Sequence, residues 1–248
     1  MVSESRYRGG GVAIPCYFSA AKLKHEWMKK GFQQLFKASK THRRNRRAKP
    51  YASQMASQNP NPPISEITPG LFIGDVGSSW NANGLRQHQI KSILSVNDEP
   101  TAMWRRASFT SIITQDRHLK MFCLDSSHQD LLVHMRRACE FIETSLAHGG
   151  VLVHCVQGVS RSTTFVIAYL MRRDRRGLDE VLADVKLKRK VRPSENFMTQ
   201  LGLWGQMEYE IWEDEEKKVP KAPYAKLLKE KGLTAVLPPS AAEIAFGF

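Results

Sequence analysis

The apolar residues between positions 67 and 212 fall into two kinds of pattern. Residues 130–147 repeat apolar side chains at helical spacing, and Gly149-Gly150 end that pattern. Strands that alternate with helices predict an α/β fold with a central, largely parallel twisted sheet flanked by helices. Short apolar runs with the length of strands occur at 90–96, 120–124 and 151–153.

Composition divides the chain into four parts. Residues 67–212 hold the alternating pattern and are enough for one domain with its own core. Residues 51–66 are rich in Ser, Gln, Asn and Pro, which is typical of a linker. Residues 213–248 begin with a charged run, contain several prolines and are expected to form an exposed C-terminal tail. Residues 1–50 form a basic N-terminal extension.

The positive charge is concentrated in residues 1–50. This segment contains 13 Lys and Arg and two Glu, a net charge of +11, whereas the whole chain carries +13. The Arg-rich cluster at 40–49 predicts contact with nucleic acid or an import receptor. The apolar stripe at 22–37, which is flanked by Lys, favours binding to an anionic membrane. A mitochondrial presequence and a plain disordered extension are further interpretations, so the role of this segment stays open.

One strand-like run leads directly into a candidate nucleophile. The run ends at His154-Cys155, and five residues separate this thiol from Arg161, after which a helical pattern follows at 163–171. A loop at a helix N-terminus points its N–H groups at one place, where the helix dipole also favours negative charge. The planar guanidinium of Arg161 can donate to two phosphate oxygens, and the same positive field favours the thiolate of Cys155. The motif therefore predicts a covalent phosphoryl-transfer site.

The residues between the Cys and the Arg are expected to bind the substrate phosphate. Their backbone N–H groups would hold its oxygens together with the Arg161 side chain. These loop residues are Val156, Gln157, Gly158, Val159 and Ser160.

The sequence His-Cys-x5-Arg-Ser resembles the signature of the cysteine-dependent protein tyrosine phosphatase superfamily, and its second half is most similar to the dual-specificity phosphatases. One departure is Gln157, which stands where the family commonly has Ala. The resemblance implies a cysteine phosphatase-like fold with a single catalytic domain. It also implies that the Ser162 hydroxyl assists departure of the cysteine sulfur and that His154 holds the loop and tunes the thiolate. Asn196, at the start of the last core helix, is expected either to brace the phosphate loop or to cap the helix.

The reaction also needs an acid, because an alkoxide or phenoxide is a poor leaving group at neutral pH. The resemblance implies an Asp on a loop that precedes the Cys-containing strand. Asp125 follows the strand at 120–124 directly and is the preferred candidate, whereas Asp130 precedes an apolar helix and is better placed to cap it. The residues alone do not exclude Asp130. No metal and no cofactor are expected, since the histidines and cysteines lack metal-ligand spacing.

These features predict a dual-specificity protein phosphatase that removes phosphate from tyrosine and from serine or threonine in phosphoproteins. Two alternatives stay open: a phosphatase for phosphoinositide or RNA phosphates, and a catalytically idle phosphopeptide-binding scaffold. The four unevenly spread cysteines do not form a disulfide framework, and a catalytic thiol favours a reducing compartment. We therefore expect a cytoplasmic or nuclear protein, and we expect it to be a monomer.

Overall fold

The computed structural model describes residues 60–98 and 101–234. The basic extension, most of the expected linker and the last residues of the chain lie outside this range. The elements in chain order are β1 (Ile64–Thr68), β2 (Leu71–Gly74), η1 (Ser78–Trp80), α3 (Ala82–Gln87), β3 (Ile90–Asn97), η2 (Ala102–Arg105), α4 (Ala107–Thr110), η3 (Gln115–Arg117), β4 (His118–Phe122), α5 (Leu132–Leu146), β5 (Gly150–His154), α6 (Arg161–Asp174), α7 (Leu178–Lys188), α8 (Glu195–Gln206) and α9 (Ala222–Lys231).

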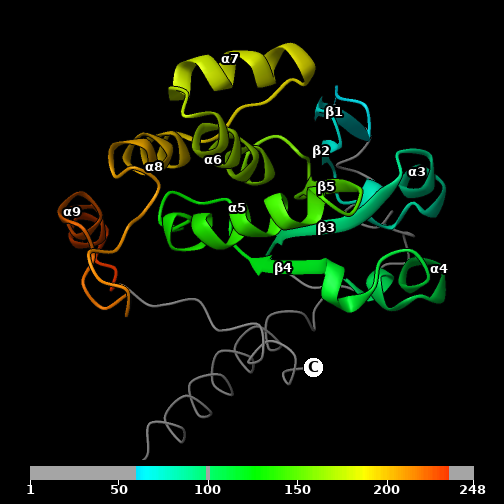
Figure 1. The fold of residues 1–248 in the computed structure, drawn as a ribbon, viewed down its shortest axis with the longest axis horizontal. Coiled ribbons are helices and arrows are strands. Elements are labelled where there is room, and N and C mark those ends of the chain that lie inside the picture. The colour runs from blue at the N-terminus through cyan, green and yellow to red at the C-terminus, as the bar shows by residue number, and fades with distance from the viewer. Residues whose placement is uncertain (1–59, 99–100, 235–248) are drawn as a thin grey trace, which may run out of the picture. The chain divides into compact units, whose positions relative to one another are not determined.

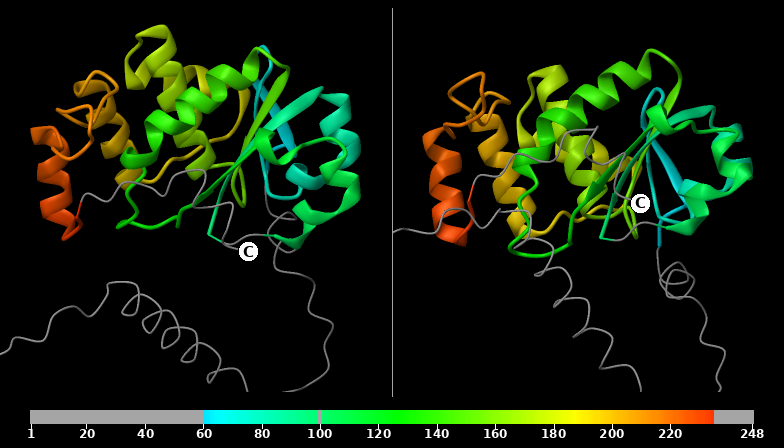
Figure 2. Two further views of the ribbon diagram at one scale, coloured as in Figure 1. Left: turned by 60° about the horizontal axis from the view of Figure 1, so that its bottom comes forward. Right: turned by 90° about the horizontal axis from the view of Figure 1, so that it is seen from below.

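The strands form one five-stranded sheet with helices on both faces (Figures 1 and 2). Their order is β1-β2-β5-β3-β4, in which β2, β5, β3 and β4 run parallel and β1 pairs antiparallel with β2. The predicted α/β fold with a largely parallel sheet is confirmed. The sheet is mixed because β1 and β2 are joined by a tight turn at Gly70, whose φ of 77° lies in the left-handed region.

The two faces of the sheet carry separate hydrophobic cores. β5 shows the division, since Val151 and Val153 pack into the larger core with α5, α6 and α8, while Leu152 packs into the smaller core with α3, η2 and α4. Successive side chains of a strand point to opposite faces, so a strand that is covered on both faces is apolar throughout. This burial explains the unbroken apolar run that ends at the candidate nucleophile.

Residues 213–234 belong to the folded domain. α9 places Tyr224, Leu227 and Leu228 in the larger core, and the rings of Trp212 and Tyr224 meet edge to face with centroids 5.9 Å apart. These apolar positions share one helix face, but they are few in a segment rich in Lys, which made the pattern easy to miss. The structure therefore differs from the expected exposed tail, because the domain continues through α9.

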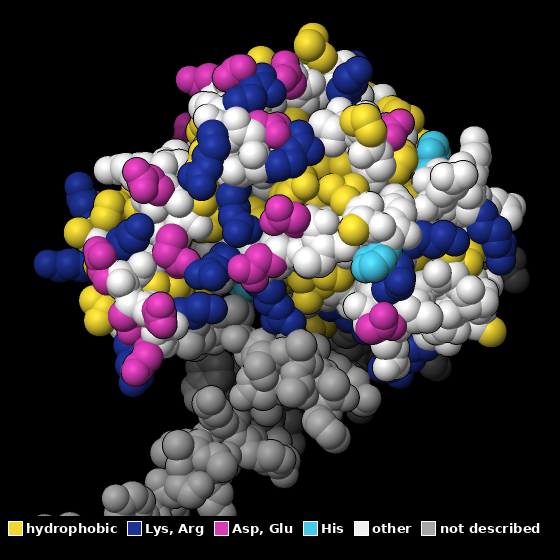
Figure 3. Space-filling view, in the orientation of Figure 1, with side chains coloured by type: hydrophobic (Ala, Val, Ile, Leu, Met, Phe, Trp, Pro, Cys, Tyr) yellow, Lys and Arg dark blue, Asp and Glu magenta, His cyan; other side chains and the backbone are white. Residues whose placement is uncertain are grey.

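Charges of both signs are mixed over the surface shown in Figure 3. Outside residues 1–50 the chain carries a net charge of only +2. In the part of the chain that the structure describes, no helix has the length and apolar character needed to span a bilayer.

Candidate active site

The predicted site residues lie where parallel strands end at their carboxyl edge, the usual ligand-binding edge of such a sheet. β5 ends directly before Cys155, and α6 begins at Arg161. β4 ends shortly before Asp125. We call residues 155–161 the phosphate loop and residues 123–131 the acid loop. Hydrogen bonds join the two loops, so the structure brings the predicted nucleophile, arginine and acid together.

Cys155 is buried, with 2% of its surface exposed, and its sulfur receives two hydrogen bonds. The N–H of Gly158 donates to Sγ at 3.2 Å, and the hydroxyl of Ser162 donates to it at 3.3 Å. Two donors aimed at one sulfur favour negative charge on that atom. The nucleophile and the predicted helper hydroxyl are therefore in direct contact.

Gly158 gives the phosphate loop its shape. Its φ of 66° is one that side chains rarely adopt, and a Cβ at this position would lie 2.4 Å from the carbonyl oxygen of Gly74 and 2.7 Å from Nη2 of Arg189. Only glycine fits between the backbone of β2 and the Arg189 side chain. The loop thus depends on close packing as well as on its own sequence.

Arg161 is buried at the start of α6 and extends toward the acid loop. Its Nη1 donates to the carbonyl oxygen of Cys123 at 2.9 Å and contacts Oδ1 of Asp98 at 3.4 Å. Its Nε is buried without a hydrogen-bond acceptor among the described residues. Because a buried donor without a hydrogen bond is costly, a phosphate oxygen would supply the acceptor that Nε lacks, in place of the Asp125 carboxylate 3.6 Å away.

Asp125 lies at the rim of the phosphate loop. Its Oδ1 accepts a hydrogen bond from the Ser160 hydroxyl at 3.0 Å, and its Oδ2 lies 3.6 Å from Nε of Arg161. The side chain is 40% exposed, so it is open to a substrate that enters the loop. This position satisfies the reach that a general acid needs.

Asp130 has a different environment. Its carboxylate accepts hydrogen bonds from the N–H groups of Leu132 and Val133 in the first turn of α5, at 2.9 and 3.5 Å. It also accepts the Tyr224 hydroxyl at 2.6 Å. Burial raises the pKa of Asp130, while these donors act in the opposite direction. The carboxylate caps the helix and contacts α9, which favours Asp125 as the acid.

Asn196 braces the acid loop rather than the phosphate loop. Its amide donates to the carbonyl oxygens of Ser126 and Gln129, both at 2.9 Å. Capping of α8 belongs to Ser194, whose hydroxyl accepts the N–H of Phe197 at 3.4 Å. Both expected roles are thereby corrected, because Asn196 is the second residue of α8, behind the cap, and faces the acid loop and not the Cys155 loop.

Arg189 is a site residue that no sequence motif indicated. This buried side chain donates to the carbonyl oxygens of Gly158 at 2.8 Å and Gln157 at 3.3 Å. On its other side Nη1 donates to the carbonyl oxygen of Pro62 at 2.8 Å and to the Ser65 hydroxyl at 2.9 Å. Carbonyls that are held outward leave the N–H groups of the phosphate loop to point inward. Its place in a Lys- and Arg-rich run made it look like a surface charge.

His154 lies in a hydrogen-bonded chain behind the cysteine. Its Nε2 is 2.6 Å from Oγ of Ser95, which is also 2.7 Å from Nε2 of His118. Its Nδ1 faces the carbonyl oxygen of Cys155 at 3.4 Å. Burial lowers the pKa of His154 to about 3 and that of His118 to about 2, so both rings are neutral at pH 7.

The carbonyl of Cys155 determines which atom donates and which accepts in each hydrogen bond of this chain. An oxygen acceptor at Nδ1 of His154 requires the N–H there, so Nε2 must accept the hydroxyl of Ser95. The Ser95 oxygen then accepts the N–H at Nε2 of His118. The arrangement fits the loop-holding role that the resemblance implied for His154, and it adds two residues to it.

Among residues 60–98 and 101–234, no group of three or more His, Cys, Asp or Glu side chains is arranged to hold a metal ion. The donor set at the site consists of backbone N–H groups, hydroxyls and one guanidinium. Such donors suit an oxyanion rather than a cation.

Comparisons with known proteins identify the family. Residues 71–207 match the family model described as the dual specificity phosphatase, catalytic domain. The chain is 35% identical over 147 residues to the dual specificity protein phosphatase MPK-4 of Drosophila melanogaster. The matched segment covers 58% of this chain and 36% of MPK-4. It is 34% identical over 140 residues to dual specificity protein phosphatase 22-B of Danio rerio, which covers 56% of this chain and 72% of that protein.

Solved structures show the same relationship. The crystal structure of the human tyrosine phosphatase-like serine/threonine/tyrosine-interacting protein aligns with a TM-score of 0.53 at 30% identity, covering 58% of this chain and 96% of that one. Together with the site geometry, these matches place the chain in a known class. The chain belongs to the dual-specificity phosphatase family, and its folded part is the catalytic domain of that family.

Proposed function

We propose that this protein hydrolyses phosphotyrosine and phosphoserine or phosphothreonine in phosphoproteins through a cysteinyl-phosphate intermediate. One observation carries the proposal. The Cys155 sulfur accepts two hydrogen bonds inside a loop that ends at Arg161, and Asp125 lies at the rim of that loop. Nucleophile, oxyanion donors and acid are thus all present within one site.

In the first step the Cys155 thiolate attacks phosphorus, an S–P bond forms, and the bond from phosphorus to the side-chain oxygen of the substrate breaks. Arg161 and the loop N–H groups stabilise the equatorial oxygens. The leaving oxygen takes a proton from the Asp125 carboxyl. Because a bound phosphate competes with Asp125 for Arg161, substrate binding releases this carboxyl toward the leaving oxygen.

In the second step water attacks phosphorus and the P–S bond breaks. Asp125, now a carboxylate, accepts a proton from the water. The Ser162 hydroxyl, 3.3 Å from Sγ of Cys155, stabilises the sulfur as it leaves. Inorganic phosphate and the free thiolate are the products.

Three variants test the mechanism, assayed with p-nitrophenyl phosphate and with phosphoserine peptides. Cys155→Ser should abolish turnover. Asp125→Ala should lower kcat for the peptides by about 10² or more, the usual contribution of a general acid. The matched control is Asp130→Asn, which keeps an acceptor oxygen for α5, presents an amide N–H to the Tyr224 oxygen and should change kcat little.

Other outcomes would redirect the proposal. A large loss with Asp130→Asn and none with Asp125→Ala would make Asp130 the acid. No turnover by reduced, folded wild-type protein would contradict the enzyme and favour phosphopeptide binding. Hydrolysis of phosphoinositide or RNA phosphates in preference to phosphopeptides would retain the chemistry and change the substrate.

We further propose that the basic extension at 1–50 directs the enzyme within the cytoplasm or nucleus. The support is its charge of +11 and the Arg cluster at 40–49. Fluorescent full-length chain and a variant with Arg43, Arg44, Arg46 and Arg47 changed to Ser would be compared in cells. Unchanged distribution would contradict the proposal, and liposome and nucleic-acid binding would distinguish the possible contacts.

We expect the enzyme to act as a monomer, which light scattering would check.

A further inference from the structure

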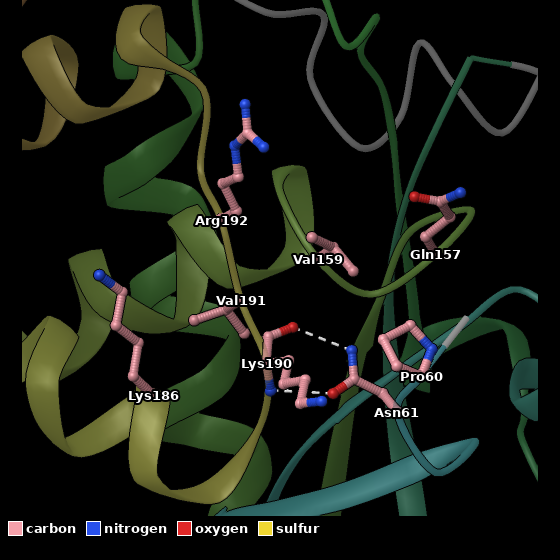
Figure 4. Close-up of a pocket in the computed structure, with 8 residues that line it drawn as sticks. All are labelled: Pro60, Asn61, Gln157, Val159, Lys186, Lys190, Val191 and Arg192. Carbon is pink, nitrogen blue, oxygen red and sulfur yellow. Dashed lines mark hydrogen bonds between the residues drawn. The ribbon is translucent and has the colours of Figure 1, made fainter. Parts of the chain in front are cut away.

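The two loops of the site are held by different parts of the chain. The phosphate loop is bound by the segment that follows α7, where the N–H of Arg192 donates to the carbonyl oxygen of Val159 at 2.9 Å. The Asn61 amide holds this segment in turn, since it donates to the Lys190 carbonyl at 2.9 Å and accepts the Lys190 N–H at 2.8 Å (Figure 4). These contacts do not reach the acid loop, so its position depends on other elements.

α9 contacts the acid loop at two points. The Tyr224 hydroxyl, in the first turn of the helix, donates to Oδ2 of Asp130 at 2.6 Å. The Nζ of Lys231, the last residue of the helix, donates to the carbonyl oxygen of Ser127 at 2.5 Å. These two donors lie about 10 Å apart along a helix axis, so α9 supports a length of the acid loop and not one atom of it.

α9 is itself fixed to the domain. The side chains of Tyr224, Leu227 and Leu228 are buried in the larger core. The N–H of Lys221, directly before the helix, donates to the carbonyl oxygen of Ile211 at 2.9 Å. The core therefore sets the place from which the two donors of α9 reach the acid loop.

The acid is carried by a backbone that is bound on both sides of it. The N–H of Leu124, which precedes Asp125, donates to Oε1 of Gln129 at 2.8 Å. The carbonyl of Ser127, two residues after Asp125, is the one that α9 holds. The donors of α9 bind other residues of the loop and act on Asp125 through the backbone, so they are positioning residues.

The position of the acid matters most for phosphate on serine and threonine. Their alkoxide is a poorer leaving group than the phenoxide of tyrosine, whose conjugate phenol has a pKa of about 10. The P–O bond to serine or threonine therefore depends more strongly on a proton from Asp125. A small displacement of a catalytic group is already costly, so a displaced Asp125 should slow this reaction more than the reaction of phosphotyrosine.

We propose that α9 sets how well this enzyme dephosphorylates serine and threonine relative to tyrosine, because Tyr224 and Lys231 hold the acid loop where Asp125 can protonate an alkoxide. The inference rests on the proposed function and names residues that determine the substrate class of that same site. α9 lies beyond the segment that matches the family model, which ends at residue 207. The C-terminal region of this chain thus adds a support to the matched segment.

The test compares the wild type with a double variant, Tyr224→Phe with Lys231→Met. Each change removes a donor and nearly keeps the size of the side chain. The measurement is kcat/KM for a phosphoserine and a phosphotyrosine peptide of otherwise identical sequence. The value for the phosphoserine peptide should fall about tenfold and that for the phosphotyrosine peptide about twofold, so their ratio should decrease about fivefold.

Lys229→Met is the matched control. It removes the other lysine of the last turn of α9, whose side chain is exposed, and should leave the ratio at its wild-type value. An equal fall for both peptides in the double variant would show a general loss of structure and overturn the proposal. A ratio that stays unchanged in the double variant, or that changes as much in Lys229→Met, would overturn it as well.

An arm without turnover separates this inference from the proposed function. In the Cys155→Ser protein, amide hydrogen exchange at residues 123–131 should become about tenfold faster when the double variant is introduced, while residues 155–161 keep their protection. If the wild type hydrolyses neither peptide nor p-nitrophenyl phosphate, the proposed function fails, and the substrate preference fails with it. Normal hydrolysis together with unchanged exchange at residues 123–131 would contradict the support from α9 alone.

Discussion

At the scale of single residues, the position of the catalytic cysteine depends on a glycine within the phosphate loop and on side chains behind that loop. Arg189 holds two carbonyls of the phosphate loop, and Gly158 has room only because it lacks a Cβ. Behind them, the chain from His118 through Ser95 to His154 ends at the carbonyl of Cys155 itself. Each contact limits the positions that the loop N–H groups can take.

The direction of the histidine chain leads to a test at His118. The N–H of His118 polarises the hydroxyl of Ser95, which then donates more strongly to Nε2 of His154. This in turn makes the Nδ1–H of His154 a stronger donor to the Cys155 carbonyl. His118→Leu removes this donor, so the pH profile of kcat/KM and of iodoacetamide alkylation of Cys155 should move to higher pH. The alkylation rate at pH 6 should fall by less than fivefold, the full worth of a hydrogen bond of about 1 kcal/mol, because the donor acts on Cys155 only through Ser95 and His154.

His118→Gln supplies the matched control, because its amide N–H can replace the one at Nε2. The glutamine variant should restore most of the wild-type profile. A merely structural role would lower the free energy of unfolding in both variants and leave the pH profile in place. That result would remove His118 from the positioning network.

Some of these residues could be predicted from the sequence and others could not. Cys155 and Arg161 could be predicted because the motif is contiguous and its spacing is fixed by one loop. Arg189 could not, since its partners at Pro62 and Gly158 are distant in the chain and its neighbours in sequence are ordinary surface lysines. Ser95 and His118 lie on strands, where a polar residue carries no sign of the partner it faces.

At the scale of elements, α8 and α9 determine the position of the acid loop. Asn196 and Gln200 of α8 hold the carbonyl of Gln129, and Tyr224 of α9 donates to Asp130. Lys231 at the end of α9 donates to the Ser127 carbonyl at 2.5 Å. The helical pattern predicted α8, but α9 escaped notice because its apolar stripe is short and surrounded by lysines.

The contact of Asn196 in α8 with the acid loop can be tested by comparing substrates with poor and good leaving groups. Asn196→Ala frees two carbonyls of the acid loop, so Asp125 should protonate the leaving oxygen less well. The kcat for a phosphoserine peptide, which has a poor leaving group, should fall about tenfold, and the kcat for p-nitrophenyl phosphate should fall less.

Ser194→Ala is the control on the same helix. Loss of this cap should lower the free energy of unfolding by about 1 kcal/mol without changing the ratio of the two rates. A ratio that shifts equally in both variants would show a general loss of stability. It would contradict a specific role for Asn196 in placing the acid.

At the scale of the whole molecule, buried neutral histidines make stability depend on pH. The folded-state pKa values of His154 and His118, about 3 and about 2, lie below the usual value of about 6.5 that these side chains regain on unfolding. The unfolded chain therefore binds more protons below pH 6.5, so their contribution is complete above that pH and is lost as the pH falls toward 3. From pH 6.5 to 5.5 these two histidines should lower the free energy of unfolding by about 2 kcal/mol, and His134, whose pKa burial lowers to about 4, should add about 1 kcal/mol.

Urea unfolding at pH 7.5, 6.5 and 5.5 would measure this slope. The raised pKa of Asp130 acts in the opposite sense, because the folded state then takes up that proton more readily as the pH falls. A free energy of unfolding that stays level across this range would contradict neutral burial of both histidines. The same scan on His118→Leu should give about two thirds of the slope that the histidines produce, because His154 and His134 remain.

Arg189 also ties the start of the domain to the phosphate loop. The same guanidinium that holds the Gly158 carbonyl holds the carbonyl of Pro62, at the first residues of the described chain. Any tether fastened to residues 1–59 is joined to the enzyme at this point. Tension on such a tether would act on Arg189 as well as on the Asn61 amide that binds Lys190, and the part that reaches Arg189 would pull on the carbonyls behind Cys155. Anchoring of the enzyme would then also change its turnover.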